Sequence, residues 1–372
     1  MAQSFRADHL GSFLRPPEVL KLREQPDADG EQMRAQLRKL EDEYIVRVLK
    51  KQQDLGFHIF TDGEVRRATF MSDFNDAVEG LGEGMSERQW QASGNPKGKP
   101  MEVHGVVAGK VRAKRRMTAH EVPILKQHSP GAIKMTLPTP NQFPAIMYKK
   151  GISDKVYPTY SEFLWDIVPI FNAEIKALVN EGIQYIQIDA PRYSYYIDPK
   201  WREFIRLEMG VDPEKALEEA IKVDNATLEG ARKPGVTLAI HLCRGNNRSQ
   251  WYAQGGYDAI AEKLFTTLKV DKYLLEYDDE RSGNFEPLRF LPRGKKVVLG
   301  LVSSKLARME NPKDIVKRIE EAAKIVPLED LSVSPQCGFA STMVGNALTE
   351  DEQWAKMKLI ADVAKQVWGT TE

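Results

Sequence analysis

The chain has 372 residues, of which 42% are apolar and 28% charged, enough apolar material for a sizeable core. Its 53 Lys and Arg residues balance its 53 Asp and Glu residues, so it lacks the charge excess of proteins that bind nucleic acid or anionic membranes. Two cysteines cannot form a disulfide framework and are typical of a reducing compartment. With no secretion signal and no run of about 18 apolar residues, we expect a cytoplasmic protein.

Short apolar segments alternate with longer segments of helical period, a pattern typical of repeated strand-helix units. Eight strands are predicted, at 8–14, 58–64, 132–138, 185–191, 236–243, 273–278, 296–303 and 331–337. Eight such units favour a (β/α)8 TIM barrel, in the α/β class, over an open doubly wound sheet, which stays the alternative because a sequence does not give strand order. We therefore predict a single barrel domain that covers residues 1–372.

Helix boundaries are marked between these strands. The segment 32–55 has an apolar face and is followed by Gly56, which can end a helix in the left-handed conformation. Asp212 and Asn311 are each followed by proline, which predicts two N-caps. Thr349 with a glutamate three residues later predicts a capping box at the start of the last helix.

The segment 82–131 interrupts the alternation and is rich in Gly, Lys and Arg. We interpret it as an insertion that carries a β-hairpin. Its basic run at 110–116 is interpreted first as a solvated surface and second as a site for an anionic group.

The predicted strand 236–243 carries the most informative pattern. With a period of two, one face is wholly aliphatic, and the other ends in His241 and Cys243. In a barrel the aliphatic face would pack on the helices, and the last residues of the other face would lie at the carboxyl-terminal rim, where barrel enzymes place their sites. Imidazole and thiolate two residues apart are a zinc-type ligand pair.

Two further residues at predicted strand ends extend this pair. Cys337 ends one strand, and Glu276 lies within another. Two thiolates, one imidazole and one exchangeable carboxylate would bind Zn²⁺ and leave a position for a substrate thiol, which indicates alkyl transfer to sulfur. The alternative is that both cysteines are inert, buried small side chains and that His241 is a structural histidine.

Six segments together resemble the cobalamin-independent methionine synthase family, specifically its C-terminal catalytic barrel. In family order they are Arg6-Ala-Asp-His-Leu-Gly-Ser12, Asp62-Gly-Glu-Val-Arg-Arg67, Gln187-Ile-Asp-Ala-Pro191, His241-Leu-Cys243, Leu275-Glu-Tyr-Asp-Asp-Glu-Arg-Ser282 and Pro335-Gln-Cys-Gly338. The resemblance covers essentially the whole chain, and it is closest to the short, single-barrel members. It implies a (β/α)8 barrel with zinc held by His241, Cys243, Glu276 and Cys337.

The resemblance also implies a substrate site. Leu10, Gly11 and Ser12 match the segment that holds the amino-acid part of homocysteine. Glu64 and Asp189 match the carboxylates that receive its ammonium group. No catalytic residue is assigned beyond the zinc ligands.

The methyl-donor half of the family pattern departs from this sequence. The tryptophan on which the pterin stacks has no counterpart near 138–143, and the acidic residue after the matched aspartate is Ala190. The proton-donor histidine of the long enzymes falls near Val302 and Ser303. The N-terminal barrel of the double-length members has no counterpart either. The thiol-activating half therefore matches the family, whereas the donor half is altered.

Together these features predict a zinc-dependent S-methyltransferase that activates a thiol, homocysteine first, for attack on a donor such as a methyltetrahydrofolate. Its partners would be a small thiol and a methyl or alkyl donor. One alternative keeps the zinc and uses another electrophile, such as an epoxide or a methylcobalamin-type donor. Another is a non-catalytic zinc-binding protein, and the decarboxylase branch with the same barrel architecture is disfavoured because it needs no zinc.

Other polar residues near these motifs are weaker candidates. Arg66 or Arg67 could bind a substrate carboxylate or sulfonate, and an internal ion pair is the competing interpretation. One tyrosine among Tyr193, Tyr195 and Tyr196 could line the pocket, and packing of their loop on the helical shell is the alternative.

Overall fold

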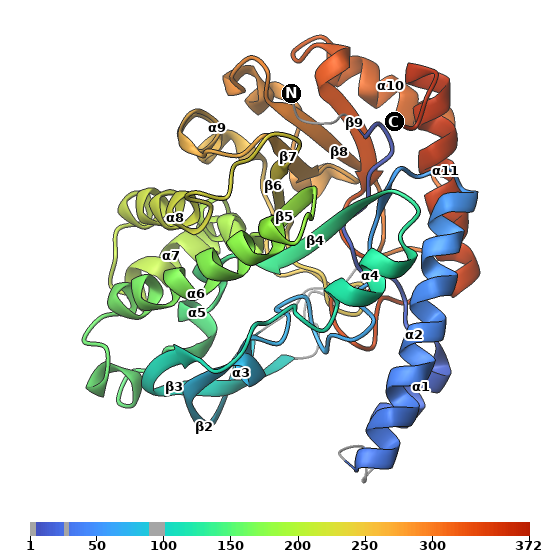
Figure 1. The fold of residues 1–372 in the computed structure, drawn as a ribbon. Coiled ribbons are helices and arrows are strands. Elements are labelled where there is room, and N and C mark those ends of the chain that lie inside the picture. Colours follow the sequence, from blue (N-terminus) through green and yellow to red (C-terminus); the bar gives the residue numbers. More distant parts are fainter. Residues whose placement is uncertain (1–4, 26–29, 89–100) are drawn as a thin grey trace.

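The structure is a computed structural model that describes residues 5–25, 30–88 and 101–372. Helices and strands alternate along most of the chain (Figure 1). The strands are β1 (Ile59–Phe60), β2 (Val78–Arg88), β3 (Met101–Ala113), β4 (Ala132–Pro138), β5 (Tyr185–Asp189), β6 (Thr237–Leu242), β7 (Lys272–Glu276), β8 (Lys296–Val302) and β9 (Leu331–Pro335).

The helices vary in length from one turn to more than five. They are α1 (Pro17–Arg23), α2 (Glu31–Asp54), α3 (Phe74–Ala77), α4 (Val122–His128), α5 (Pro144–Met147), α6 (Tyr160–Asn180), α7 (Pro199–Leu207), α8 (Pro213–Thr227), α9 (Ala261–Thr267), α10 (Pro312–Ala323) and α11 (Glu350–Trp368). Short 3₁₀ helices join them, namely η1 (Pro140–Gln142), η2 (Ser153–Lys155), η3 (Pro191–Tyr196), η4 (Tyr257–Ala259), η5 (Glu280–Ser282), η6 (Glu286–Phe290) and η7 (Leu328–Asp330). In the part of the chain that the structure describes, no helix is both long and apolar enough to cross a bilayer.

The central sheet has seven parallel strands in the order β1-β4-β5-β6-β7-β8-β9. Each strand of this sheet lies beside the sheet strand that precedes it along the chain, so the strand order never reverses. A doubly wound sheet requires such a reversal, so the open-sheet alternative is wrong. The predicted strands at 58–64, 132–138, 185–191, 236–243, 273–278, 296–303 and 331–337 each correspond to one strand of this curled parallel sheet.

The first predicted strand, 8–14, is wrong. The N-terminal segment forms a single parallel bridge, between Ala7 and Val333 of β9, and Asp8 donates its backbone N–H to the Val333 carbonyl over 2.9 Å. Beyond this bridge the chain leaves the sheet at Gly11, whose φ of +110° lies outside the range of regular strand backbone. The backbone N–H of Phe13 then bonds to the Gly63 carbonyl in a loop.

Strands β2 and β3 pair antiparallel as a separate two-stranded sheet, away from the central strands in Figure 1. The pair occupies the region where the sequence predicts an insertion at 82–131, but it already begins at Val78. Residues 89–100 of that predicted insertion lie outside the described residues. In the basic run, Arg115 pairs with Asp73, and Lys110 lies over the Tyr157 ring.

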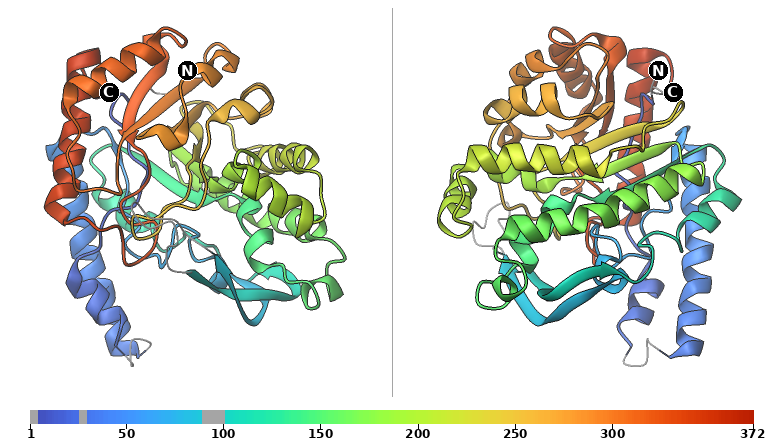
Figure 2. Two further views of the ribbon diagram at one scale, coloured as in Figure 1. Left: turned by 180° about the vertical axis from the view of Figure 1, so that it is seen from behind. Right: turned by 60° about the vertical axis from the view of Figure 1, so that its left-hand side comes forward.

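The predicted helix boundaries are confirmed. Asp212 accepts hydrogen bonds from the N–H groups of the first turn of α8, and Asn311 does the same for α10. Thr349 forms both hydrogen bonds of the predicted capping box at the start of α11. Gly56, just after α2, has φ +87°. Figures 1 and 2 show α2 and α11 side by side, although they come from opposite ends of the chain.

The alternation along β6 explains how the site is directed inward. Leu238, Ile240 and Leu242 belong to the large apolar cluster shared with the helices. Ala239 belongs instead to a small cluster with residues of neighbouring strands, among them Tyr185 and Leu274. The side chains that alternate with the aliphatic face therefore point to the inside of the curled sheet, as the sequence predicts for His241 and Cys243.

Candidate functional site

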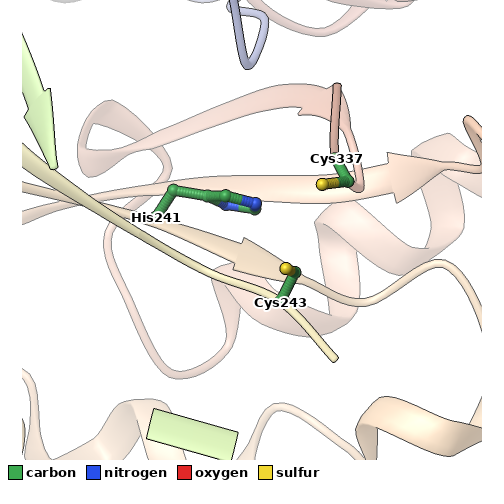
Figure 3. Close-up of side chains that lie close together, drawn as sticks. All are labelled: His241, Cys243 and Cys337. Atoms are coloured by element: carbon green, nitrogen blue, oxygen red, sulfur yellow. The ribbon is translucent and has the colours of Figure 1, made fainter. Parts of the chain in front are cut away.

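The predicted ligands His241, Cys243 and Cys337 come together at the carboxyl ends of two strands (Figure 3). Among the described residues, their ligand atoms form a buried group in which all lie within 4.8 Å of one another. Strands β6 and β9 are three positions apart, which in a flat sheet would separate them by roughly 14 Å. The curl of the sheet therefore closes this group.

The orientation of the His241 ring suits a metal ligand. Its Nδ1 lies 3.1 Å from the Leu274 carbonyl, which can only accept, so Nδ1 carries the proton and donates. Its Nε2 is buried and has no hydrogen-bond partner among the described residues. A carbonyl that accepts from Nδ1 leaves Nε2 as the ring atom that can bind a metal, which is a common arrangement behind a metal-binding histidine.

The two cysteines differ in acidity. A hydrogen bond between their side chains holds the pKa of Cys337 well below its usual value and raises the pKa of Cys243. Burial lowers the pKa of His241, but Cys337 and Asp189 more than offset this, so the net shift is upward. Cys337 is therefore the thiol that ionises first, and a metal ligand must be ionised.

The fourth predicted ligand, Glu276, lies at the end of β7 outside this group of three. Its Oε2 accepts the backbone N–H of Arg244 over 2.8 Å, and its Oε1 accepts from Arg281 Nη2 over 3.0 Å. Burial would raise the pKa of this carboxyl, but Lys305, Arg281 and Arg244 hold it at about 2. Glu276 is thus an anion with partners in the protein, and its role as a ligand stays a prediction.

The predicted substrate residues line the same pocket as the three ligands. Leu10, Ser12, Glu64 and Asp189 are all part of its wall. Gly11 lies against it, because a Cβ at this position would lie 2.5 Å from Glu64 Oε1. The structure therefore brings the two predicted sets of residues into one cavity.

The two carboxylates of the pocket have different partners. Glu64 Oε1 accepts from Thr136 Oγ1 over 2.6 Å, and burial raises its pKa. Asp189 Oδ1 accepts from Gln187 Nε2 over 2.8 Å. Burial raises the pKa of Asp189 to about 7, against the opposing effect of His241. Arg67 Nη1 already lies 3.7 Å from Glu64 Oε1, so Asp189 is the carboxyl of the two that most favours a cationic ligand.

Other residues of the wall were not predicted from the sequence. They are Thr69, Phe70, Met71, Gln142, Ile146, Pro191, Gly245, Asn246, Tyr252, Gly338, Ser341 and Thr342. Gly338 lies in the recognised segment around Cys337, and most of the others come from loops after strands. A search of the residues that follow each predicted strand would have found many of them.

The weaker sequence candidates do not line the pocket. Arg67 forms two hydrogen bonds with Glu121, at 2.8 and 2.7 Å, and Arg66 pairs with Asp42, so both form internal ion pairs. The three tyrosines pack elsewhere, with Tyr195 stacked on the Trp201 ring at 4.1 Å. The prediction that one of these three lines the pocket is therefore wrong, and Tyr252, from a different loop, lines it instead.

The curled parallel sheet places an imidazole–dithiol group, which could hold a soft metal ion, at the carboxyl ends of its strands, where α/β barrel enzymes have their active sites. Residues 5–366 match the family described as cobalamin-independent synthase, catalytic domain. The chain belongs to the cobalamin-independent methionine synthase family, a family of methyltransferases.

The chain is also similar to individual proteins over most of its length. An uncharacterized protein, YxjH of Bacillus subtilis, is 39% identical over 370 residues, covering 98% of this chain and 95% of that protein. The methionine synthase of Saccharolobus solfataricus is 24% identical over 338 residues, 89% of this chain and 86% of that protein.

Two solved structures are similar over nearly the whole chain. A putative vitamin-B12-independent methionine synthase of Listeria monocytogenes has a TM-score of 0.74 at 30% identity and covers 99% of both chains. A B12-independent methionine synthase of Shewanella sp. W3-18-1, in complex with selenomethionine, has a TM-score of 0.74 at 19% identity and covers 98% of both chains.

Proposed function

We propose that this protein is a zinc-dependent S-methyltransferase whose thiol substrate is homocysteine and whose donor is a methyltetrahydrofolate or a related methyl compound. The observation that carries the proposal is the shared pocket, in which the His241–Cys243–Cys337 group lies beside Glu64 and Asp189. An amino acid with a short thiol side chain has a sulfur atom for the imidazole–dithiol group and an ammonium group for the two carboxylates.

Zinc fits the residues present. The donor set is one imidazole and two thiols, and the buried His241 Nε2 has no partner among the described residues. Structural zinc sites are almost always bound by four protein ligands, whereas catalytic ones keep an open position. Because the group lines a pocket, a substrate atom could reach the metal, which favours catalysis over the purely structural metal of a non-catalytic protein. When bound, zinc would supply the Lewis acidity that lowers the pKa of a substrate thiol.

The chain's own residues would bind and orient the amino acid. Glu64 and Asp189 would receive the ammonium group of homocysteine. Ser12 belongs to the segment that would hold the amino-acid part of the substrate, including its carboxylate. Glu276, already ionised and held by Arg281, would act as the exchangeable fourth ligand. We also infer that the N-terminal segment at Ala7 completes the curled sheet as a single (β/α)8 catalytic barrel over residues 1–372.

The charge of the pocket discriminates among thiols. Within the described part of the chain, its wall includes the acidic residues Glu64 and Asp189 and neither lysine nor arginine. A sulfonate-bearing thiol would have no cation to pair with, whereas the ammonium group of an amino-acid thiol would pair with the two carboxylates. This supports homocysteine over anionic thiols.

A second electrophile is kept as an alternative because the donor side departs from the family pattern. Phe143, the aromatic residue of the 138–143 segment, is buried against Phe74 with ring centroids 4.1 Å apart, and it does not line the pocket. Assays of methyltetrahydrofolates, methylcobalamin and small epoxides in parallel separate the donor classes, because one class is expected to turn over.

Metal analysis tests the proposal. We expect one zinc per chain in the purified protein and a much lower content in Cys243→Ser and Cys337→Ser. Lys358→Met, which changes an exposed residue of α11, is the matched control and should keep its zinc. Much less than one zinc in the unmodified protein, with no further loss in Cys243→Ser, would contradict the proposal.

A further inference from the structure

Gln187 on β5 is a fully buried amide directly beneath the pocket, and the proposed function gives it no role. Its Nε2 donates to Asp189 Oδ1 over 2.8 Å and to the Leu10 carbonyl over 3.2 Å. Asp189 and Leu10 both line the pocket. One amide nitrogen thus joins two parts of the wall where the amino-acid half of the substrate would bind.

Lys134 fixes the direction in which this amide points. Its Nζ is fully buried and donates to Gln187 Oε1 over 3.1 Å. The same ammonium group donates to Asp8 Oδ1 and to the His9 carbonyl, each over 2.5 Å. Because an ammonium group can only donate, the oxygen of Gln187 must face Lys134, and its nitrogen must face Asp189. A turned amide would place one oxygen against the carboxylate and the NH₂ group against a cation.

This arrangement determines which oxygen of Asp189 is presented. The hydrogen bond from Gln187 occupies Oδ1, and among the hydrogen bonds of the described residues Oδ2 takes part in none. Asp189 ends β5 at the wall of the pocket, so a ligand's ammonium group can reach Oδ2 without displacing the Gln187 bond. The carboxylate is therefore preoriented before a ligand arrives.

We propose that Gln187, with its amide direction set by Lys134, is a positioning residue that makes the pocket selective for thiols and thioethers bearing an α-ammonium group. The inference rests on the proposed function, since it assumes that Asp189 receives that group. Gln187 does not touch the ligand, so its contribution is confined to ligands that use Asp189.

Calorimetry with two ligands tests this selectivity. L-Methionine carries the ammonium group, and 4-(methylsulfanyl)butanoate is the same molecule without it. We expect the unmodified full chain to prefer L-methionine. In Gln187→Met, which keeps the volume and removes the hydrogen bonds, we expect about tenfold weaker binding of L-methionine and unchanged binding of the analogue, as for the loss of a supporting partner.

A matched control separates positioning from general loss of stability. Gln353 on α11 is an equally buried glutamine that accepts the Leu14 N–H, and Gln353→Met should retain the preference for L-methionine. If Gln187→Met does not remain folded in thermal unfolding, Gln187→Glu takes its place. That variant still accepts from Lys134 but turns an oxygen toward Asp189, so the preference should again be lost.

The outcomes separate the two proposals. If the unmodified chain shows no preference for L-methionine, the proposed substrate is wrong, and the inference fails with it. If that preference is present and survives in the Gln187 variant, the inference alone is overturned. Equal weakening of both ligands also overturns it, because it would mean a general structural role.

Discussion

Arg281 Nη2 donates a 3.0 Å hydrogen bond to Oε1 of Glu276, the carboxylate that the family resemblance assigns to zinc. The same guanidinium group lies over the Trp251 ring at 4.3 Å, which helps to hold it in place. A carboxylate with this partner can leave a metal without becoming an uncompensated buried charge. The Arg281–Glu276 pair therefore explains how Glu276 could act as an exchangeable ligand.

The first prediction concerns this pair. In zinc-free protein, Arg281→Met should lower the free energy of unfolding by about 3 kcal/mol, because it leaves the buried Glu276 without its side-chain partner. With zinc added, the loss should be smaller if Glu276 binds the metal. Urea unfolding with and without zinc measures both values.

The control for that experiment is the exposed pair of Lys358 and Asp362 on α11. Lys358→Met should change stability by no more than about 0.5 kcal/mol in either condition. An equal loss for Arg281→Met with and without zinc would argue against Glu276 as a ligand.

The second prediction concerns acid stability. Burial and the charge of Lys134 lower the pKa of His9 to about 4. Between its ordinary pKa of about 6.5 and pH 4, the unfolded chain therefore binds a proton that the folded chain does not, so stability falls as the pH decreases through this range. This group should cost about 2 kcal/mol between pH 7 and pH 5.

Urea unfolding at both pH values tests this contribution. His9→Gln can still donate to the Ile59 carbonyl, which His9 Nε2 contacts at 3.0 Å, and it removes the titrating group. The variant should therefore show a flatter pH dependence than the unmodified protein. The same slope in both proteins would mean that His9 is not the group responsible.

The third prediction concerns Gly338, which follows Cys337. A methyl group at this position would overlap Ser12 Oγ, the hydroxyl that accepts the Ala340 N–H. Gly338→Ala should therefore displace Ser12 and weaken L-methionine binding about tenfold. Calorimetry measures this change.

Gly294→Ala is the comparison for Gly338→Ala. Gly294 has φ +82° and open space around an added Cβ, so alanine there should cost about 1 kcal/mol of stability and leave binding unchanged. Unaltered binding in Gly338→Ala would remove Ser12 from the proposed substrate site.

The central strands could be predicted from the sequence because their local signals agree with their final environment. Residues 132–138 and 296–303 are short apolar segments, and nearly every residue of β4 and β8 is buried. The period-two pattern of β6 directs His241 inward regardless of the rest of the fold. The predicted strand 8–14 does not form because the chain turns at Gly11, whose φ is +110° and whose carbonyl accepts a hydrogen bond from Thr61 Oγ1.

The site could be predicted in part for the same reason. The strand-end ligands follow from local pattern and resemblance, but the tyrosines after β5 do not line the pocket because η3 turns Tyr195 onto Trp201. Tyr252 lines it because its backbone N–H bonds to the Arg244 carbonyl, which folds that loop back over the site. Such contacts within irregular loops leave no periodic trace in the sequence.

Zinc K-edge X-ray absorption, recorded with and without L-homocysteine, tests the central claim most directly. The group of His241, Cys243 and Cys337 provides two sulfur ligands. Direct binding of the substrate thiol should add a third sulfur and remove an oxygen or nitrogen ligand. A spectrum that does not change at saturating homocysteine would contradict the claim that this site activates the thiol.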